Sequence, residues 1–406
     1  MSDYSQLACP PSDRAFSRKA AIVGIGETDF RADYQAERAR APGYRPPTPE
    51  TLMQTAFERA LADSGLRRED VDGLAVSFTY GGPAPEEAAQ LLGVKPRYCT
   101  RNGNIMAGPL PVVCADIALG KADTVAMVYM VSSRSIGRTY GGSTYVGGQG
   151  GPSSYYYYHP WGWSSQAAHW AMIWQHYMNR FGKREEDLGA VAVQVRHHAR
   201  ANPDAIMQAP MTIADYLASR TIVRPMHLFD MCLVNDGAVC LIVRKADLAR
   251  ELAHAPVLVA GWGEAANSHR KLEVLVRERL RPLLQKAGGE ALAMAGMALD
   301  DIRHFEGYDA STIHLVDQIE GYGFAATGTG LDFCQAGEMT HGGRLPTNTG
   351  GGNLSGSYMH GWSQVAEVVR QLRHEAGPRQ VADLQVAMSS LAQTDQAHPI
   401  LYERGA

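Results

Sequence analysis

The stretch with the clearest chemical character covers residues 347–361, which read T-N-T-G-G-G-N-L-S-G-S-Y-M-H-G. Three successive glycines are unsuited to a helix or strand interior, because glycine loses the most backbone entropy on folding and has no side chain to pack. The segment is therefore predicted to be a loop pressed against a ligand. After it, apolar residues recur at helical spacing from Trp362 onward. The loop thus places the phenol of Tyr358 just before a helix N-terminus, which attracts negative charge.

Length and composition restrict the class of protein. A chain of 406 residues is long enough for two packed domains. The apolar fraction of 45% and the charged fraction of 20% are typical of a soluble globular protein. A net charge of -4 offers no basic surface for nucleic acid. Because the chain shows neither an apolar stretch of about 18 residues nor a leader-like N-terminus, we expect no membrane span and a cytoplasmic location.

The cysteines show no spacing that would indicate a disulfide framework or a metal site. They are Cys9, Cys99, Cys114, Cys232, Cys240 and Cys334. Most are expected to be small core residues, and we expect this chain to bind no metal and no cofactor of its own.

Predicted strands alternate with predicted helices along the chain. Residues 20–24, 71–76 and 124–131 are apolar and strand-like, whereas residues 51–64 form an amphipathic helix that ends at a glycine. This alternation predicts an α/β fold with a largely parallel sheet covered by helices on both faces. Residues 136–163 differ, since they combine glycine pairs with many tyrosines and tryptophans. They fit either a packed aromatic loop or a substrate wall for a flat, multi-ring compound.

Several segments resemble thiolases, especially the sterol carrier protein branch. The loop is similar to the thiolase pattern N-x-x-G-G-x-x-x-x-G-H-P, with Gly351 and Gly352 on the paired glycines, and the catalytic histidine of that family falls on Tyr358. Residues 224–241 resemble the thiolase motif P-x-x-L-L-D-C-x-x-x-S-D-G-A-A-A. The resemblance implies a thiolase fold, in which two similar halves each contain a mixed, mostly parallel sheet layered with helices (αβαβα). Residues 1–262 and 263–406 would form these two domains.

The departures from the thiolase pattern concern its catalytic cysteines. By resemblance the nucleophile position falls near Gly103, and the second catalytic cysteine belongs within residues 386–396, yet neither place has a cysteine. Cys99 lies four residues early and could be restored to the site by an insertion. The box E-G-Y-D-A-S at residues 306–311 places Tyr308 where thiolases have an oxyanion-hole residue, so two tyrosines occupy two catalytic positions of the family.

This set of residues favours a retro-aldol reaction over Claisen-type acyl transfer. Retro-aldol cleavage of a β-hydroxyacyl-CoA needs one group to take the hydroxyl proton, another to protonate the enolate carbon, and donors for the thioester oxygen, but no thiolate. Tyr308 and Tyr358 could divide the proton transfers, in either order. An ordinary tyrosine has a pKa near 10, so forming the phenolate at pH 7 costs roughly 4 kcal/mol.

Other residues are candidates to assist the two phenols. The supporting candidates are His341, His360 and Asp309, and the helix N-terminus after Tyr358 could stabilise a phenolate. Residues expected on the substrate side are Gly351, Gly352, Asn353 and Gly103.

The exchange of cysteines for tyrosines resembles the thiolase-like aldolases of bacterial steroid side-chain degradation. In that family a 17-hydroxy steroid carboxyl-CoA is cleaved to a 17-ketosteroid and propionyl-CoA, by a homodimer bound to a small partner with an OB-fold and a zinc ribbon. The resemblance implies the same substrate class and partners here, with the CoA thioester bound as substrate. Three alternatives stay open: an aromatic β-hydroxyacyl-CoA as substrate, a true thiolase that uses Cys99, and a catalytically silent subunit completed by a partner.

Overall fold

The computed structural model describes residues 14–40, 42–79, 82–101, 108–137, 159–161, 163, 165–266, 280–393 and 396–405. The strands are β1 (Ala20–Glu27), β2 (Gly73–Thr79), β3 (Tyr98–Arg101), β4 (Thr124–Ser132), β5 (Thr221–Val223), β6 (Met226–His227), β7 (Asp236–Lys245), β8 (Val257–Trp262), β9 (Ala265–Ala266), β10 (Phe305–Gly307), β11 (Val386–Gln393) and β12 (Gln396–Arg404). The helices are α2 (Phe30–Arg38), α3 (Pro49–Ser64), α4 (Pro85–Leu92), α5 (Pro109–Ala118), α7 (Gln166–Phe181), α8 (Glu185–Arg200), α9 (Ile213–Ala218), α10 (Ala246–Ala249), α11 (Leu280–Ala295), α12 (Thr312–Tyr322), α13 (Gly330–Gln335) and α14 (Trp362–Arg373).

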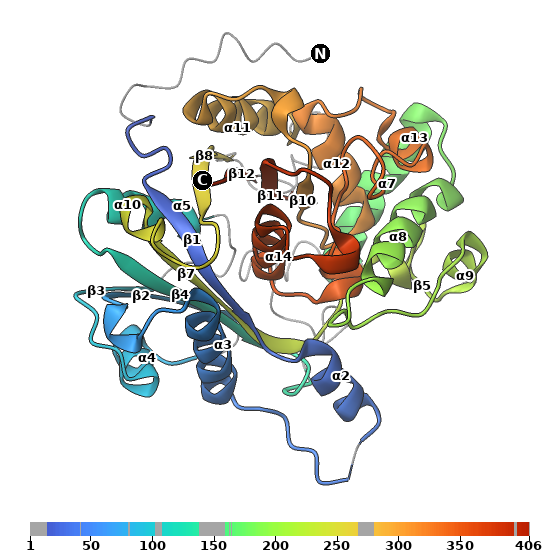
Figure 1. The fold of residues 1–406 in the computed structure, drawn as a ribbon. Coiled ribbons are helices and arrows are strands. Elements are labelled where there is room, and N and C mark those ends of the chain that lie inside the picture. Colours follow the sequence, from blue (N-terminus) through green and yellow to red (C-terminus); the bar gives the residue numbers. More distant parts are fainter. Residues whose placement is uncertain are drawn as a thin grey trace.

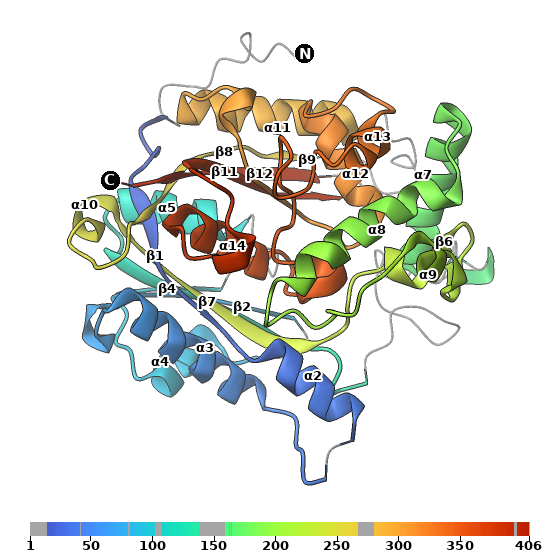
Figure 2. The same ribbon diagram turned by 45° about the vertical axis from the view of Figure 1, so that its right-hand side comes forward.

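The large sheet runs in the order β10-β11-β12-β8-β1-β7-β4-β2-β3, and β9 pairs with β12. Figures 1 and 2 show that this path folds into two layers, because β8 and β1 lie where one layer passes into the other. Helices α5 and α14 lie between the layers, α11 and α12 cover the outer face of one, and α3 and α4 cover the outer face of the other (Figure 2). This is the expected α/β arrangement of five layers, αβαβα.

The sheet is mixed, as expected. β2 pairs in parallel with β3 and β4, and β10 pairs in parallel with β11. The strands between these ends are joined by antiparallel pairs, including β1 with β7 and β11 with β12. The parallel share is therefore smaller than the alternation of strands and helices suggested, because the chain adds β7, β8 and β12 as antiparallel neighbours.

The division into domains 1–262 and 263–406 stays a prediction.

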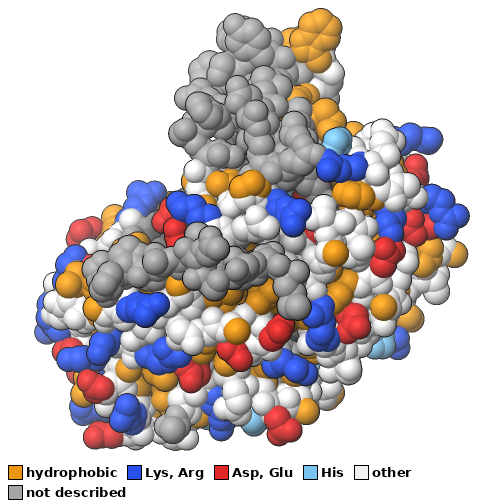
Figure 3. Space-filling model, turned by 90° about the horizontal axis from the view of Figure 1, so that it is seen from above, with side chains coloured by type: hydrophobic (Ala, Val, Ile, Leu, Met, Phe, Trp, Pro, Cys, Tyr) orange, Lys and Arg blue, Asp and Glu red, His pale blue; other side chains and the backbone are white. Residues whose placement is uncertain are grey.

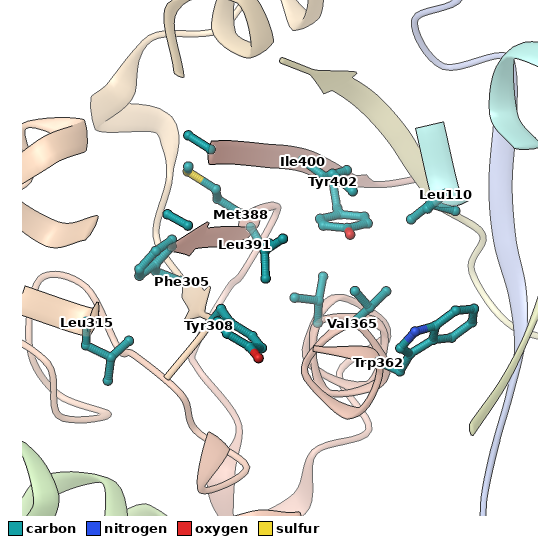
Figure 4. Close-up of a cluster of buried hydrophobic side chains, with 14 of the residues drawn as sticks. Leu110, Phe305, Tyr308, Leu315, Trp362, Val365, Met388, Leu391, Ile400 and Tyr402 are labelled. Carbon is teal, nitrogen blue, oxygen red and sulfur yellow. The ribbon is translucent and has the colours of Figure 1, made fainter. Parts of the chain in front are cut away.

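Local sequence explains the elements that carry the site. Helix α3 begins after Thr48, whose side chain accepts a hydrogen bond from the N–H of Thr51, and it ends at Gly65 in the left-handed conformation. The helix expected from Trp362 onward is confirmed as α14. Its apolar residues face both layers, so Trp362 and Val365 are buried against side chains of other elements (Figure 4).

No helix in the described ranges combines the length and the apolar character that crossing a bilayer requires.

Candidate active site

The structure brings together the two tyrosines that the sequence singled out. Tyr308 follows β10, and Tyr358 ends the glycine-rich loop just before α14, fifty positions later. Their hydroxyl oxygens lie 2.9 Å apart, which is hydrogen-bond distance. Tyr308 is 3% exposed and points toward α14 (Figure 4), whereas Tyr358 keeps some access to solvent.

Backbone hydrogen bonds hold both phenols in place. The N–H of Tyr308 donates to the carbonyl of Ser390 on β11 at 2.8 Å. The carbonyl of Tyr308 accepts from the side-chain amide of Gln318 on α12 at 2.9 Å. The N–H of Tyr358 donates to Oδ1 of Asn235 at 2.7 Å. Each phenol is therefore attached to a different part of the fold, and their contact depends on how those parts pack.

The glycine-rich loop owes its glycines to close packing against the protein. It makes a π-helical turn, Gly352–Gly356, after Gly351, and these first two glycines have φ values of 97° and 52°. A Cβ on Gly351 would lie 2.6 Å from the Cβ of Ala199, and a Cβ on Gly352 would lie 2.2 Å from Oδ2 of Asp309. Such positions exclude any larger side chain. The atoms nearest to a Cβ at either glycine therefore belong to the protein itself.

Asp309 fastens this loop to the end of β10. Its carboxylate is buried and accepts hydrogen bonds from the N–H of Asn353 at 2.8 Å and from the side chain of Gln364 at 3.2 Å. Burial raises the pKa of Asp309 to about 7, although the hydrogen bonds from Asn353 and Asn348 act in the opposite direction. Asp309 and Asn353 therefore support the loop that carries Tyr358.

Two N–H groups of the loop are occupied. The N–H of Asn353 donates to Asp309 and that of Tyr358 donates to Asn235, so neither is free to stabilise a thioester oxygen. The loop therefore offers fewer backbone donors for a thioester oxygen than we expected.

Only one of the two supporting histidines lies beside the tyrosines. His360 has its ring centroid 4.4 Å from that of Tyr358, and its Nδ1 pairs with the hydroxyl of Tyr129. Burial lowers the pKa of His360 to about 4, so the ring is neutral at pH 7. His341 instead packs edge-on against His198, 4.4 Å between ring centroids, and burial lowers the pKa of His341 too. Neither histidine supplies a positive charge at neutral pH.

The surroundings of Tyr358 oppose ionisation of its phenol. Burial raises the pKa of Tyr358, and the neighbouring phenol of Tyr308 and thiol of Cys232 raise it further. We expected nearby groups to stabilise a phenolate, and this expectation is not met in the described residues. At pH 7 the phenol of Tyr358 is therefore neutral.

The remaining candidates have different outcomes. Gly103, and residues 138–158, 162 and 164 of the aromatic segment and its flank, lie outside the described residues. Cys99 is exposed on β3, at the opposite end of the strand order from β10. Partial burial and the nearby carboxylate of Glu86 raise the pKa of the Cys99 thiol, so it is not activated.

Sequence reasoning missed two residues that lie at the phenols. Asn235 lies within residues 224–241, which had served only as a fold motif, and its amide oxygen orients the backbone of Tyr358. Cys232 lies in the same segment, and burial raises the pKa of its thiol to about 12. That motif was the available signal, because it is the one stretch of the N-terminal half that matches the thiolase pattern in detail.

In the part of the chain that the structure describes, no group of three or more His, Cys, Asp or Glu side chains could hold a metal ion.

Comparison with known proteins identifies the family. The Thiolase C-terminal domain-like family matches residues 265–394. The chain is 33% identical over 372 residues to the steroid side-chain-cleaving aldolase of Thermomonospora curvata. The alignment covers 87% of this chain and 90% of the relative. It is 34% identical over 373 residues to the 17-hydroxy-3-oxo-4-pregnene-20-carboxyl-CoA lyase of Mycobacterium tuberculosis, with 88% and 92% covered.

A solved structure agrees with this result. The Ltp2-ChsH2(DUF35) aldolase superposes with a TM-score of 0.83 at 30% identity, covering 96% of this chain and 99% of that chain. Human mitochondrial 3-ketoacyl-CoA thiolase shares the fold, with a TM-score of 0.67 at 15% identity over 96% of this chain and 98% of that chain. The chain therefore belongs to the family of thiolase-like aldolases.

Proposed function

We propose that this protein cleaves a β-hydroxyacyl-CoA by a retro-aldol reaction, giving a ketone and a shorter acyl-CoA. The observation that carries the proposal is the contact of 2.9 Å between the hydroxyls of Tyr308 and Tyr358. Its substrate is a steroid 17-hydroxy side-chain CoA thioester, and its products are a 17-ketosteroid and propionyl-CoA. The names of the two relatives above support this choice, since both specify steroid side-chain chemistry.

The phenol pair can move the required protons without first becoming charged. One phenol takes the proton of the substrate hydroxyl and passes its own proton across the hydrogen bond to the second phenol. The second phenol delivers a proton to the α carbon of the departing acyl-CoA. The bond between the α and β carbons breaks, the β carbon becomes the ketone, and both tyrosines end as neutral phenols. This relay avoids most of the cost of a free phenolate, which the burial of Tyr358 would increase.

The position of Cys99 argues against a thiolase reaction. A thiolase needs a reactive thiolate beside the acyl group, whereas Cys99 is exposed on the edge strand β3 and its pKa is raised. Cys232 lies closer to the phenols, but a pKa of about 12 keeps it protonated.

We also propose that the enzyme works as a homodimer bound to a small OB-fold and zinc-ribbon protein. The support is the solved relative, whose name includes a DUF35 component together with the aldolase.

The test is product analysis by mass spectrometry, with the protein and its candidate partner, a steroid 17-hydroxy side-chain CoA thioester, and no free CoA. We expect equal amounts of 17-ketosteroid and propionyl-CoA. Cys99→Ser should retain full activity, whereas Tyr308→Phe combined with Tyr358→Phe should lose it. Cleavage that requires free CoA and disappears in Cys99→Ser would show a thiolase instead. Activity that survives the loss of both phenols would place catalysis elsewhere, as expected for a silent subunit.

A further inference from the structure

The buried side of α12 carries a row of polar side chains. Ser311 precedes the helix, and His314 and Gln318 follow at spacings of three and four residues, which places all three on one side. They are at most 1% exposed. Among the described residues, Ser311 Oγ, both ring nitrogens of His314 and Gln318 Oε1 have no hydrogen-bond partner. Buried polar atoms without partners are few in native proteins, so four in one row call for an explanation.

This row contacts the backbone of Tyr308, one of the two site tyrosines. The side-chain amide of Gln318 donates to the carbonyl of Tyr308 and to that of His314, both at 2.9 Å. The same helix that holds the backbone of Tyr308 therefore presents the unpartnered atoms.

An aromatic surface on α7 faces the row. The ring of Trp170 meets His314 edge-on, with 5.2 Å between centroids and 79° between planes. The ring of His169, one residue earlier, lies 5.6 Å from that of Trp163. Figures 1 and 2 both show α7 and α12 as neighbours. The two helices thus combine apolar ring surfaces with hydrogen-bonding atoms.

The charge state of His314 limits what it can bind. Burial, with a further contribution from His169, lowers the pKa of His314 to about 3, so the ring is neutral at pH 7. A neutral imidazole has one N–H donor and one acceptor nitrogen. Such a group, beside a serine hydroxyl, suits a carbonyl or hydroxyl oxygen and not an anion such as a phosphate.

We propose that Ser311 and His314 bind an oxygen of the acyl group remote from the bond that breaks, while Trp163 and Trp170 contact its ring system. The inference rests on the proposed function for the identity of the acyl group, which we take to be a polycyclic ketone. His314 is then a specificity residue that distinguishes oxygenated ring systems from plain hydrocarbon ones.

The test measures equilibrium binding, which needs no turnover. The ligands are androst-4-ene-3,17-dione, the same steroid without the 3-oxo group, and CoA alone, each titrated against the full chain with its partner. His314→Leu is compared with His198→Leu as a matched control. His198 is equally buried, but its Nδ1 contacts the carbonyl of Thr347 at 2.9 Å and its Nε2 contacts Gln194 at 2.9 Å.

We expect the wild type to bind the dione about tenfold more tightly than the deoxy steroid, equivalent to about 1.4 kcal/mol. His314→Leu should bind both steroids equally and bind CoA as the wild type does. Without ligand its Tm should not fall, because an apolar side chain leaves no unpaired polar atom. His198→Leu should lower the Tm and keep the preference for the dione.

Three results would overturn the inference. One is a His314→Leu variant that keeps the preference for the dione and loses as much Tm as His198→Leu, which would mean that the row holds structural water. The second is weaker CoA binding in His314→Leu, which would mean that the row faces the pantetheine arm. The third is a wild type with no preference between the steroids, even if it cleaves the CoA thioester. A preference in a wild type that cleaves nothing would retain this inference and reject the proposed function.

Discussion

Removing the two phenols one at a time and together tests the relay directly. Tyr308→Phe and Tyr358→Phe each remove the hydrogen bond of 2.9 Å between the two hydroxyls. Loss of either phenol therefore interrupts the proton path. A positioned acid or base contributes about 10²- to 10⁴-fold to a rate. Each single variant should therefore lose about 10²- to 10⁴-fold in kcat, or about 3 to 5 kcal/mol of transition-state stabilisation.

The double variant should lose no more than the worse single variant. Groups that act as one unit are strongly non-additive, because the second removal finds the path already broken. The assay is single-turnover cleavage followed by quantification of the acyl-CoA product. Two moderate losses that multiply in the double variant would refute the relay and show two independent roles.

A structural control separates catalysis from folding. Tyr402→Phe also removes one buried phenol hydrogen bond, to Ser389 Oγ at 2.8 Å, and Figure 4 shows Tyr402 on β12, apart from Tyr308. All three single variants should lose about 1 kcal/mol of folding stability, the usual net value of such a bond. Only the variants at Tyr308 and Tyr358 should lose kcat.

Three further predictions concern the support of the site. Asn235→Ala removes the acceptor of the Tyr358 N–H, so kcat should fall about tenfold or more while the Kd for the product ketone changes little, since orientation alone is lost. Gly352→Ala places a Cβ 2.2 Å from Asp309 Oδ2 at φ 52°, so by thermal melting it should destabilise clearly more than Gly65→Ala, where φ is 69° and no atom lies within 4 Å. Burial raises the pKa of Asp309 from 3.8 to about 7, so the folded state binds this proton more tightly than the unfolded state does, and the contribution of Asp309 to stability falls as pH rises from about 4 to 7. The difference in Tm between wild type and Asp309→Asn should therefore change across this window, and a constant difference would contradict the assignment.

Much of the fold was readable from local sequence. Glycine residues and capping residues mark helix ends, as Thr48 and Gly65 do for α3, and apolar periodicity marked the helix that begins at Trp362. The extent of antiparallel pairing was not readable, because β7, β8 and β12 find their neighbours through contacts distant in sequence. The start of β2 at Gly73 instead of residue 71 reflects a turn that local apolar pattern does not reveal.

The candidate site divides in the same way. Resemblance to thiolases singled out Tyr308, Tyr358 and the missing cysteines, since residue identity at a motif position is a property of the sequence. The sequence could not show which of the two candidate histidines lies at the site. His360 lies beside Tyr358, whereas His341 packs against His198. Sequence reasoning also missed Asn235, because a hydrogen bond between residues 123 positions apart leaves no local pattern.

The sequence alone determined which chemical groups are available: two tyrosines at positions where thiolases place catalytic residues, a glycine-rich loop, and no cysteine at either thiolase position. Only the tertiary structure decided that the two hydroxyls touch, because β10, the loop and α14 must pack together to bring residues fifty positions apart within 2.9 Å. Protonation was decided there as well. The pKa of a phenol or carboxyl depends on how completely other segments exclude water, and this is why Tyr358 is neutral and Asp309 titrates near pH 7.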